Sequence, residues 1–223
     1  MTMEAGTARS APSRAATPHT KFLSGALCLD FANTLSGRMD EAPVERIETH
    51  ADLIAWAETG RVLAEGRAEI LRAGGAGRRA EGSTILARAF ALRAAIHCAF
   101  AAMARGRPPV QGAIDRLNPF VLEAARHRRL EPAGGGAAWR WHGPAETLDQ
   151  VLWPIALSAA DLLTASSPFR IKECPGPHCG WLFLDRSKNG SRRWCEMAVC
   201  GNRAKARRFK RRQNREQQEV GNG

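Results

Sequence analysis

The sequence predicts an α+β protein in which a mostly helical N-terminal domain with a small β-hairpin precedes a compact C-terminal module. Apolar residues recur with a period of about 3.6 over most of residues 21–168, which is typical of amphipathic helices. Paired cysteines and a dense run of positive charge follow this region. The chain has 223 residues, 44% of them hydrophobic, and is therefore long enough for one sizeable core and a small second module.

Helices are expected at several places in the N-terminal domain. They cover residues 27–35, 50–63, 84–106, 110–126 and 146–164, where apolar side chains return to one face. The last two segments each contain a proline, which removes a backbone N–H and clashes with the preceding turn. We therefore expect these two helices to bend or restart at the proline.

Residues 127–143 differ from the surrounding helical pattern. Two short alternating runs flank three consecutive glycines, and Trp139 and Trp141 lie on one side of the second run. This arrangement predicts a β-hairpin. The tryptophan pair could stack on a ligand or, as is more common, cover part of a core.

The remaining boundaries follow from composition. Residues 1–20 are rich in Ala, Ser, Thr and Pro and are expected to form a disordered leader, and residues 216–223 a flexible tail. A Ser-Pro turn signal separates the helical domain, 21–168, from the C-terminal module, 169–215. Because the sequence shows neither a secretory signal nor a membrane-spanning apolar run, we expect a cytoplasmic protein with no membrane partner and with reduced cysteines.

Four cysteines of the module form two equally spaced pairs. Four residues separate Cys174 from Cys179 and Cys195 from Cys200, a spacing usual for zinc ligands. Pro-Gly-Pro-His inside the first pair favours a tight turn that points both sulfurs at one place. We expect these thiolates to bind one structural Zn²⁺, with His178 as a bystander. The alternatives are ordinary reduced thiols or two disulfides.

The order of segments around the cysteines predicts a treble-clef zinc module. A strand, a turn at 188–190 and a returning strand precede a helix that begins near Cys200. Ala206 and Phe209 on that helix are expected to pack against the hairpin. About 45 residues rarely build a sufficient core alone, so zinc is expected to supply much of the folding free energy.

Positive charge is concentrated in the same module. Residues 170–215 hold 14 Lys and Arg against 3 acids, which accounts for the whole formal net charge of +11. This asymmetry favours a polyanionic partner, with DNA as the first hypothesis and RNA as the alternative. A solvated helix face is the other reading, although it normally mixes signs. The expected nucleic-acid-binding residues are Arg192, Arg193, Asn202, Arg203, Lys205, Arg207, Arg208, Lys210, Arg211 and Arg212.

The segment "CGWLFLDRSKNGSRRWCEMAVCGNRAKARRFKRR" resembles the CGNR zinc-finger family, named after the tetrapeptide found here at 200–203. The motifs Phe-x-Asp-x-Ser and Arg-Arg-Trp-Cys occur in the family's order. Upstream, "LCLDFANT" is similar to the start of the ABATE domain that usually precedes this finger. The resemblance implies a bacterial, stress-related transcription regulator with a mostly helical α/β N-terminal domain, and it places the zinc ligands on Cys174, Cys179, Cys195 and Cys200.

The leading hypothesis is a DNA-binding, nucleoid-associated regulator whose helical domain acts as a sensor or a homodimerisation unit. Asp30 and Asn33 could line a pocket for a small-molecule effector, but hydrogen bonds within the fold are the favoured role for them. An RNA-binding or ribosome-associated protein is the second hypothesis. No enzyme is expected, because the histidines are scattered, nucleophile motifs such as G-x-S-x-G are missing and four thiolates would close the zinc site.

Overall fold

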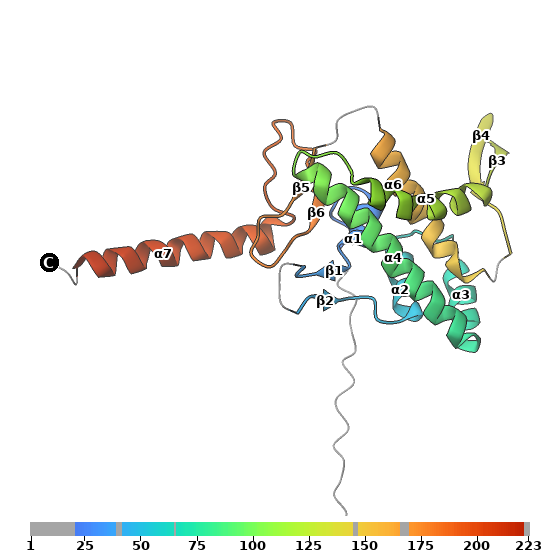
Figure 1. Cartoon of the computed structure of the whole chain (residues 1–223), viewed down its shortest axis with the longest axis horizontal. Helices are drawn as coiled ribbons and strands as arrows, with labels where there is room; N and C mark the ends of the chain where they lie inside the picture. The colour runs from blue at the N-terminus through green and yellow to red at the C-terminus, as the bar shows by residue number, and fades with distance from the viewer. Residues whose placement is uncertain (1–20, 39–41, 65, 145–146, 166–169, 221–223) are drawn as a thin grey trace, which may run out of the picture.

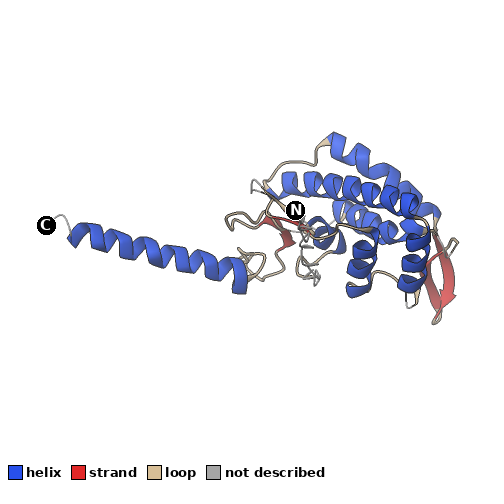
Figure 2. Ribbon diagram, turned by 90° about the horizontal axis from the view of Figure 1, so that it is seen from below, coloured by secondary structure: helices blue, strands red, loops and turns tan. Residues whose placement is uncertain are grey.

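The computed structural model describes residues 21–38, 42–64, 66–144, 147–165 and 170–220. The expected leader, 1–20, and the expected domain boundary at 168 lie outside the described residues. Helices gather into one body, and the last helix, α7, projects from it alone (Figure 1). The second view shows the same projection (Figure 2). The expected fold class, a mostly helical body with small sheets followed by a cysteine-bearing module, is confirmed.

The helices of the body enclose the core. They are α1 (Leu27–Ala32), α2 (His50–Thr59), α3 (Arg67–Gly77), α4 (Arg79–Ala104), α5 (Gln111–Arg126) and α6 (Leu152–Thr164). α4 contacts α1, α5 and the strands of the C-terminal module, and buries Leu92, Ile96 and Phe100 completely. The periodic segments of the sequence therefore form helices as expected, with α4 at the centre.

One helix was not expected from the sequence. α3 contains Gly74, Gly75 and Gly77, and glycine disfavours a helix by roughly 1 kcal/mol relative to alanine. Tertiary packing outweighs that penalty, because Leu71 is fully buried and a Cβ at Gly75 would collide with the ring of His50. The glycines thus allow α3 to approach α2 closely.

The two prolines are accommodated in different ways. α5 continues as one helix through Pro119, whereas a break or bend was expected there. Pro154 is the third residue of α6, which follows the 3-10 turn η1 (Leu148–Val151). The first turn of a helix needs no N–H from its residues, so Pro154 sits where it costs little.

A β-hairpin lies at the end of the body opposite α7 (Figures 1 and 2). Its strands are β3 (Arg128–Ala133) and β4 (Gly136–Trp141), paired from Arg128↔Trp141 to Ala133↔Gly136. Gly134 and Gly135 form the two-residue turn with φ of 56° and 82°, values that favour glycine. The predicted hairpin is therefore confirmed. A second, shorter pair is formed by β1 (Leu35–Ser36) and β2 (Val44–Glu45).

The C-terminal module pairs its strands differently from the expectation. β6 (Leu182–Leu184) pairs antiparallel with the preceding strand β5 (Ile171–Glu173), in the register Ile171↔Leu184, and the described residues contain no strand after the turn at 188–190. The expected hairpin, in which β6 would pair with a strand after the turn at 188–190, is therefore wrong. The β5–β6 pairing makes the first two cysteines part of the loop that joins these strands.

The module shares a hydrophobic core with the helical body. Ile171, Leu182 and Leu184 belong to the same buried cluster as Phe31 and Ile96. Burying each such side chain contributes about 1.5–3 kcal/mol, so contacts with the body stabilise β5 and β6. Zinc is therefore not the only source of order for this module.

α4 is long and apolar enough to raise the question of whether it crosses a membrane. By length and hydropathy it is the one helix among the described residues that could cross a membrane. More than half of its apolar window, 56%, is buried inside the fold, as in the core helix of a soluble protein.

Candidate metal centre and nucleic-acid interface

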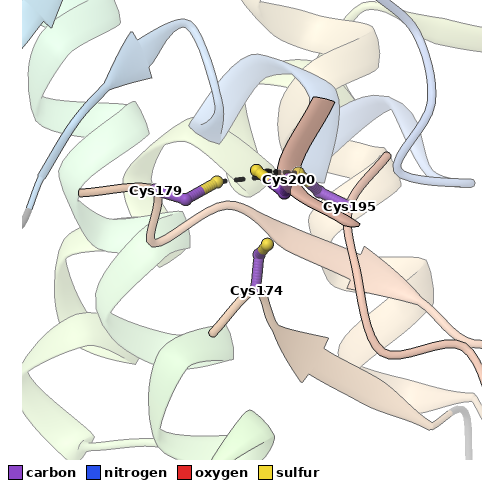
Figure 3. A group of neighbouring side chains, drawn as sticks. All are labelled: Cys174, Cys179, Cys195 and Cys200. Carbon is purple, nitrogen blue, oxygen red and sulfur yellow. Dashed lines mark hydrogen bonds between the residues drawn. The ribbon is translucent and has the colours of Figure 1, made fainter. Parts of the chain in front are cut away.

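Two turns bring the four cysteines together. Cys174 follows β5 directly, and its N–H donates to the carbonyl of Trp181 at 2.8 Å, which closes the loop carrying Cys179. Cys195 and Cys200 flank the start of η2 (Met197–Gly201), a π-helical turn that leads into α7 (Asn202–Val220). The four sulfurs point toward one another from these segments (Figure 3).

The spacing of the sulfurs fits a tetrahedral zinc ion. All four Sγ atoms lie within 4.8 Å of one another, with Cys179 and Cys200 at 3.6 and 3.5 Å from Cys195. Four sulfurs each about 2.3 Å from zinc would lie about 3.8 Å apart. All six cysteines are free, so the alternative of two disulfides is not realised.

The protonation of the cluster also fits a dication. A hydrogen bond to Cys174 raises the pKa of the Cys179 thiol to about 12. Burial raises the pKa of Cys200. Four neighbouring thiols therefore cannot all ionise without a compensating positive charge. Zn²⁺ supplies that charge, and four thiolates close its coordination sphere, so the cysteines fit one structural zinc ion.

Two glycines of the module are explained by close packing at the cluster. A Cβ at Gly176 would lie 3.1 Å from Sγ of Cys200, and a Cβ at Gly201 would overlap the side chain of Met197. A side chain at Gly176 would therefore crowd a cysteine of the cluster, and one at Gly201 would require the exposed side chain of Met197 to move. His178 is exposed and does not belong to the metal-ligating group found among the described residues.

Asn33 joins the helical body to the zinc module. Its Nδ2 donates to the carbonyl of Leu182 at 2.9 Å, and the N–H of Leu182 donates to its Oδ1 at 2.9 Å. Asp30 accepts a hydrogen bond from the N–H of Ser24 at 2.9 Å, and burial raises the pKa of its carboxyl. The structure thus places Asp30 and Asn33 in hydrogen bonds within the fold, the role that was favoured over a ligand pocket, and neither lines the groove along α6 or the groove beside the cysteine cluster.

Arg192, expected to contact nucleic acid, is half-buried and makes its hydrogen bonds within the module. Its guanidinium stacks over the ring of Phe183 at 4.4 Å. The same group donates to four backbone carbonyls at 2.6–3.3 Å, those of Leu23, Leu184, Trp194 and Cys195. These hydrogen bonds hold the segment that carries Cys195 against β6 and against the N-terminal segment at Leu23, and the residue acts as a structural clamp.

The neighbouring Arg193 is exposed and faces α7. Its guanidinium lies 4.9 Å from the ring of Trp194, and together they line a depression with Arg207, Arg208 and Arg211. The structure thus brings Arg193 next to the basic helix, although the two segments are separated by the second cysteine pair. Asn202 is also exposed, and its Nδ2 donates to the carbonyl of Ala198 at 3.1 Å.

α7 presents its positive charge to solvent. Its basic side chains are exposed, and none of them forms an ion pair with a described residue: Arg203, Lys205, Arg207, Arg208, Lys210, Arg211 and Arg212. Ala206 and Phe209 are exposed as well, the latter by 64%, so the expectation that they pack on the hairpin is wrong. The helix continues through residues 216–220, which the sequence placed in a flexible tail.

A groove beside the cysteine cluster contains basic residues that sequence reasoning missed. It has a volume of about 450 Å³ and is lined by Arg203 and Arg207 of α7 and by Lys21 and Arg46 of the body. Lys21 forms an ion pair with Glu196, and Nε of Arg46 donates to the hydroxyl of Ser36 at 2.9 Å. No local signal marks Arg46, because folding alone brings it to the zinc module.

Comparison with known families assigns both parts of the chain. Residues 25–166 match the ABATE family, which is described as "Putative stress-induced transcription regulator", and this match covers more than half of the chain. Residues 170–213 match the CGNR zinc finger. No curated protein matches the chain.

Proposed function

The chain belongs to the ABATE family and carries a CGNR zinc finger, and from this premise we propose that it is a zinc-dependent, DNA-binding transcription regulator. In this proposal the thiolate-bound zinc holds the start of α7, and the basic side chains of α7 contact the phosphate backbone. The helical body acts as a sensor or dimerisation unit in a cytoplasmic, nucleoid-associated protein. Both family types are regulatory or structural, and we propose no catalytic role.

The observation that carries the proposal is the isolation of α7. A helix of 19 residues is about 28 Å long, and the helix projects from the body with its exposed cations free of ion pairs to described residues. A solvated face normally mixes signs of charge, whereas this one has no acid between Glu196 and Glu216. The major groove admits a helix of this kind, and arginine suits bidentate contacts with phosphate or guanine.

The geometry at the base of the helix supports the same partner. Arg193 and Arg207 line one depression near the start of the helix, and Arg46 and Arg203, again with Arg207, line the groove beside the cysteine cluster. Backbone phosphates that pass over this region would meet cations from both the zinc module and the body. Each such contact would release condensed counterions, which makes affinity depend steeply on salt.

A triple variant tests the proposal against general electrostatics. Arg203→Ala, Arg207→Ala and Lys210→Ala together should weaken binding to duplex DNA and reduce the salt slope by about 0.9 log unit per lost phosphate contact. The matched control removes three exposed arginines of the body, Arg79→Ala, Arg116→Ala and Arg129→Ala, and should leave the slope unchanged. Equal effects of the two variants would show that α7 makes no specific contact.

The same titration distinguishes DNA from RNA. Fluorescence anisotropy with a duplex DNA and a structured RNA of equal length should show tighter binding to DNA at each of two salt concentrations. A preference for RNA at both concentrations would replace the transcription reading with an RNA-binding or ribosome-associated role.

A further inference from the structure

A groove runs along α6 between the β3–β4 hairpin and the zinc module. Its volume is about 540 Å³, within the roughly 300–1,000 Å³ of typical small-molecule sites. Pro154, Leu157 and Leu162 of α6 form an apolar floor, while the hairpin makes one wall and Leu184 with Arg186 of the zinc module makes the other. The groove therefore touches both parts of the chain.

Two tryptophans of the hairpin line this groove and are only partly covered. Trp139 is 51% exposed and Trp141 is 41% exposed, an unusual state for the largest apolar side chains. Trp141 is held by Trp153, with ring centroids 5.8 Å apart, and Trp153 stacks in turn on His127 at 4.0 Å. Trp141 is thus held in place by packing within the fold, and both tryptophans leave ring surface exposed on which a ligand could stack.

The charged residues that line the groove favour an anion. Arg128, Arg140 and Arg186 contribute positive charge against the single carboxylate of Asp161, and none of these four forms an ion pair with a described residue. Arg128 lies over the ring of Trp139, with its guanidinium carbon 4.4 Å from the ring centroid. A cation is therefore fixed beside the aromatic platform, where a planar guanidinium can donate to a carboxylate.

We propose that this groove binds a small planar aromatic carboxylate, with its ring stacked on Trp139 and Trp141 and its carboxylate paired with Arg128. The stacking surface, the apolar floor and the excess of arginine each match one part of such a molecule. The site is separate from Asp30 and Asn33, whose side chains are used within the fold.

Hydrogen bonds connect the groove to the zinc module. Nη2 of Arg186 donates to the carbonyl of Gly25 at 2.7 Å, and the N–H of Leu184 donates to the carbonyl of Ser24 at 2.7 Å. The carbonyl of Leu184 accepts from Arg192, which also holds Cys195. A ligand in the groove would thus touch the strand that supports the second cysteine pair. Binding itself does not depend on the proposed contact with DNA.

The test uses the full-length, zinc-loaded protein and 1-naphthoate as the probe in isothermal titration calorimetry. We expect saturable binding with one site per chain, and at least tenfold weaker binding of the neutral 1-naphthamide and of the non-aromatic cyclohexanecarboxylate. Arg128→Ala should weaken 1-naphthoate binding about tenfold, as expected for one charge-assisted hydrogen bond. Trp139→Ala should weaken it as well.

Two control variants separate this site from general anion binding. Arg129→Ala removes an exposed arginine that is the neighbour of Arg128 in β3 but does not line the groove, and should leave the affinity unchanged. Arg207→Ala with Arg211→Ala removes charge from α7 and should also leave it unchanged. Equal losses in the groove variants and in either control would overturn the proposal.

Other results would overturn it as well. They are the absence of saturable binding at millimolar 1-naphthoate, and equal affinity for 1-naphthamide. Sedimentation velocity on the same samples examines whether a second copy covers the groove. A dimer that Trp139→Ala dissociates, in a protein that does not bind 1-naphthoate, would assign the tryptophans to a subunit interface instead.

Discussion

Asn33 and Leu182 pair through both polar atoms of the Asn33 side-chain amide and both main-chain polar atoms of Leu182. The side chain of Asn33 is buried, and the two hydrogen bonds, each 2.9 Å long, satisfy the N–H and the carbonyl of Leu182, the first residue of β6 in the zinc module. This contact joins the helical body to the strand that follows the first zinc knuckle. Any change in it is expected to reach both parts.

Asn33→Ala should therefore destabilise the body and the zinc module together. It leaves a buried N–H and a buried carbonyl without partners, at a cost of about 3 kcal/mol. Urea unfolding should show one transition at lower denaturant concentration by helix signal and by zinc release alike. Asn214→Ala, an exposed position on α7, is the control and should not shift the midpoint. Zinc release that is unchanged in Asn33→Ala would show that the two parts are independent.

Arg192 and Arg193 should respond differently although they are neighbours in sequence. Arg192→Ala leaves backbone carbonyls of the module without their donor and should lower the free energy of unfolding by on the order of 2 kcal/mol. Arg193→Ala removes an exposed cation next to α7 and should leave stability unchanged while it lowers the salt slope of DNA binding. The clamp role of Arg192 would be contradicted if Arg192→Ala left the stability unchanged and lowered the salt slope of DNA binding.

Zinc affinity should fall as the pH is lowered. The metal-free cluster holds protons. A hydrogen bond to Cys174 raises the pKa of Cys179, and burial raises the pKa of Cys200. Zinc must displace these protons, so acid favours the metal-free form and alkali favours the bound form. A chelator-competition titration between neutral and mildly acidic pH should show that zinc affinity falls more than tenfold per pH unit, which corresponds to more than one proton released per zinc ion bound. A pH-independent affinity would contradict coordination by four thiolates.

Phe209→Ala should change almost nothing in the fold. The side chain is 64% exposed on a helix that leaves the body, and substitutions at such positions usually stay within about 0.5 kcal/mol. Thermal unfolding with zinc present checks this. A loss of stability well above that range would mean that Phe209 packs against the zinc module, as the sequence pattern of α7 had suggested.

The cysteine cluster and the β3–β4 hairpin could be predicted because their signals are local. Equal spacing and a glycine–proline knuckle identify the cysteine pairs, and the glycines at 134–136 mark the turn. The role of Arg192 could not be predicted in this way. Its carbonyl partners include Leu23, which is far away in the sequence, and an arginine next to another arginine reads as surface charge until the fold places it.

The strand pairing of the module was missed for a related reason. Lys188-Asn189-Gly190 is a strong local turn signal, and it does form a turn. Whether the strand before this turn pairs with the preceding strand or with a following one depends on the core against which it packs. Leu182 and Leu184 are buried against the helical body, and β5 supplies the partner strand there. Local patterning contains no information about that body.

The most direct test of the account is the dependence of DNA binding on zinc. The full-length protein should contain one zinc ion per chain, lose duplex DNA binding when a chelator removes the metal, and regain it with one equivalent of Zn²⁺. Metal-free protein that binds DNA with the same affinity and salt slope would contradict the claim that zinc holds the basic helix in place.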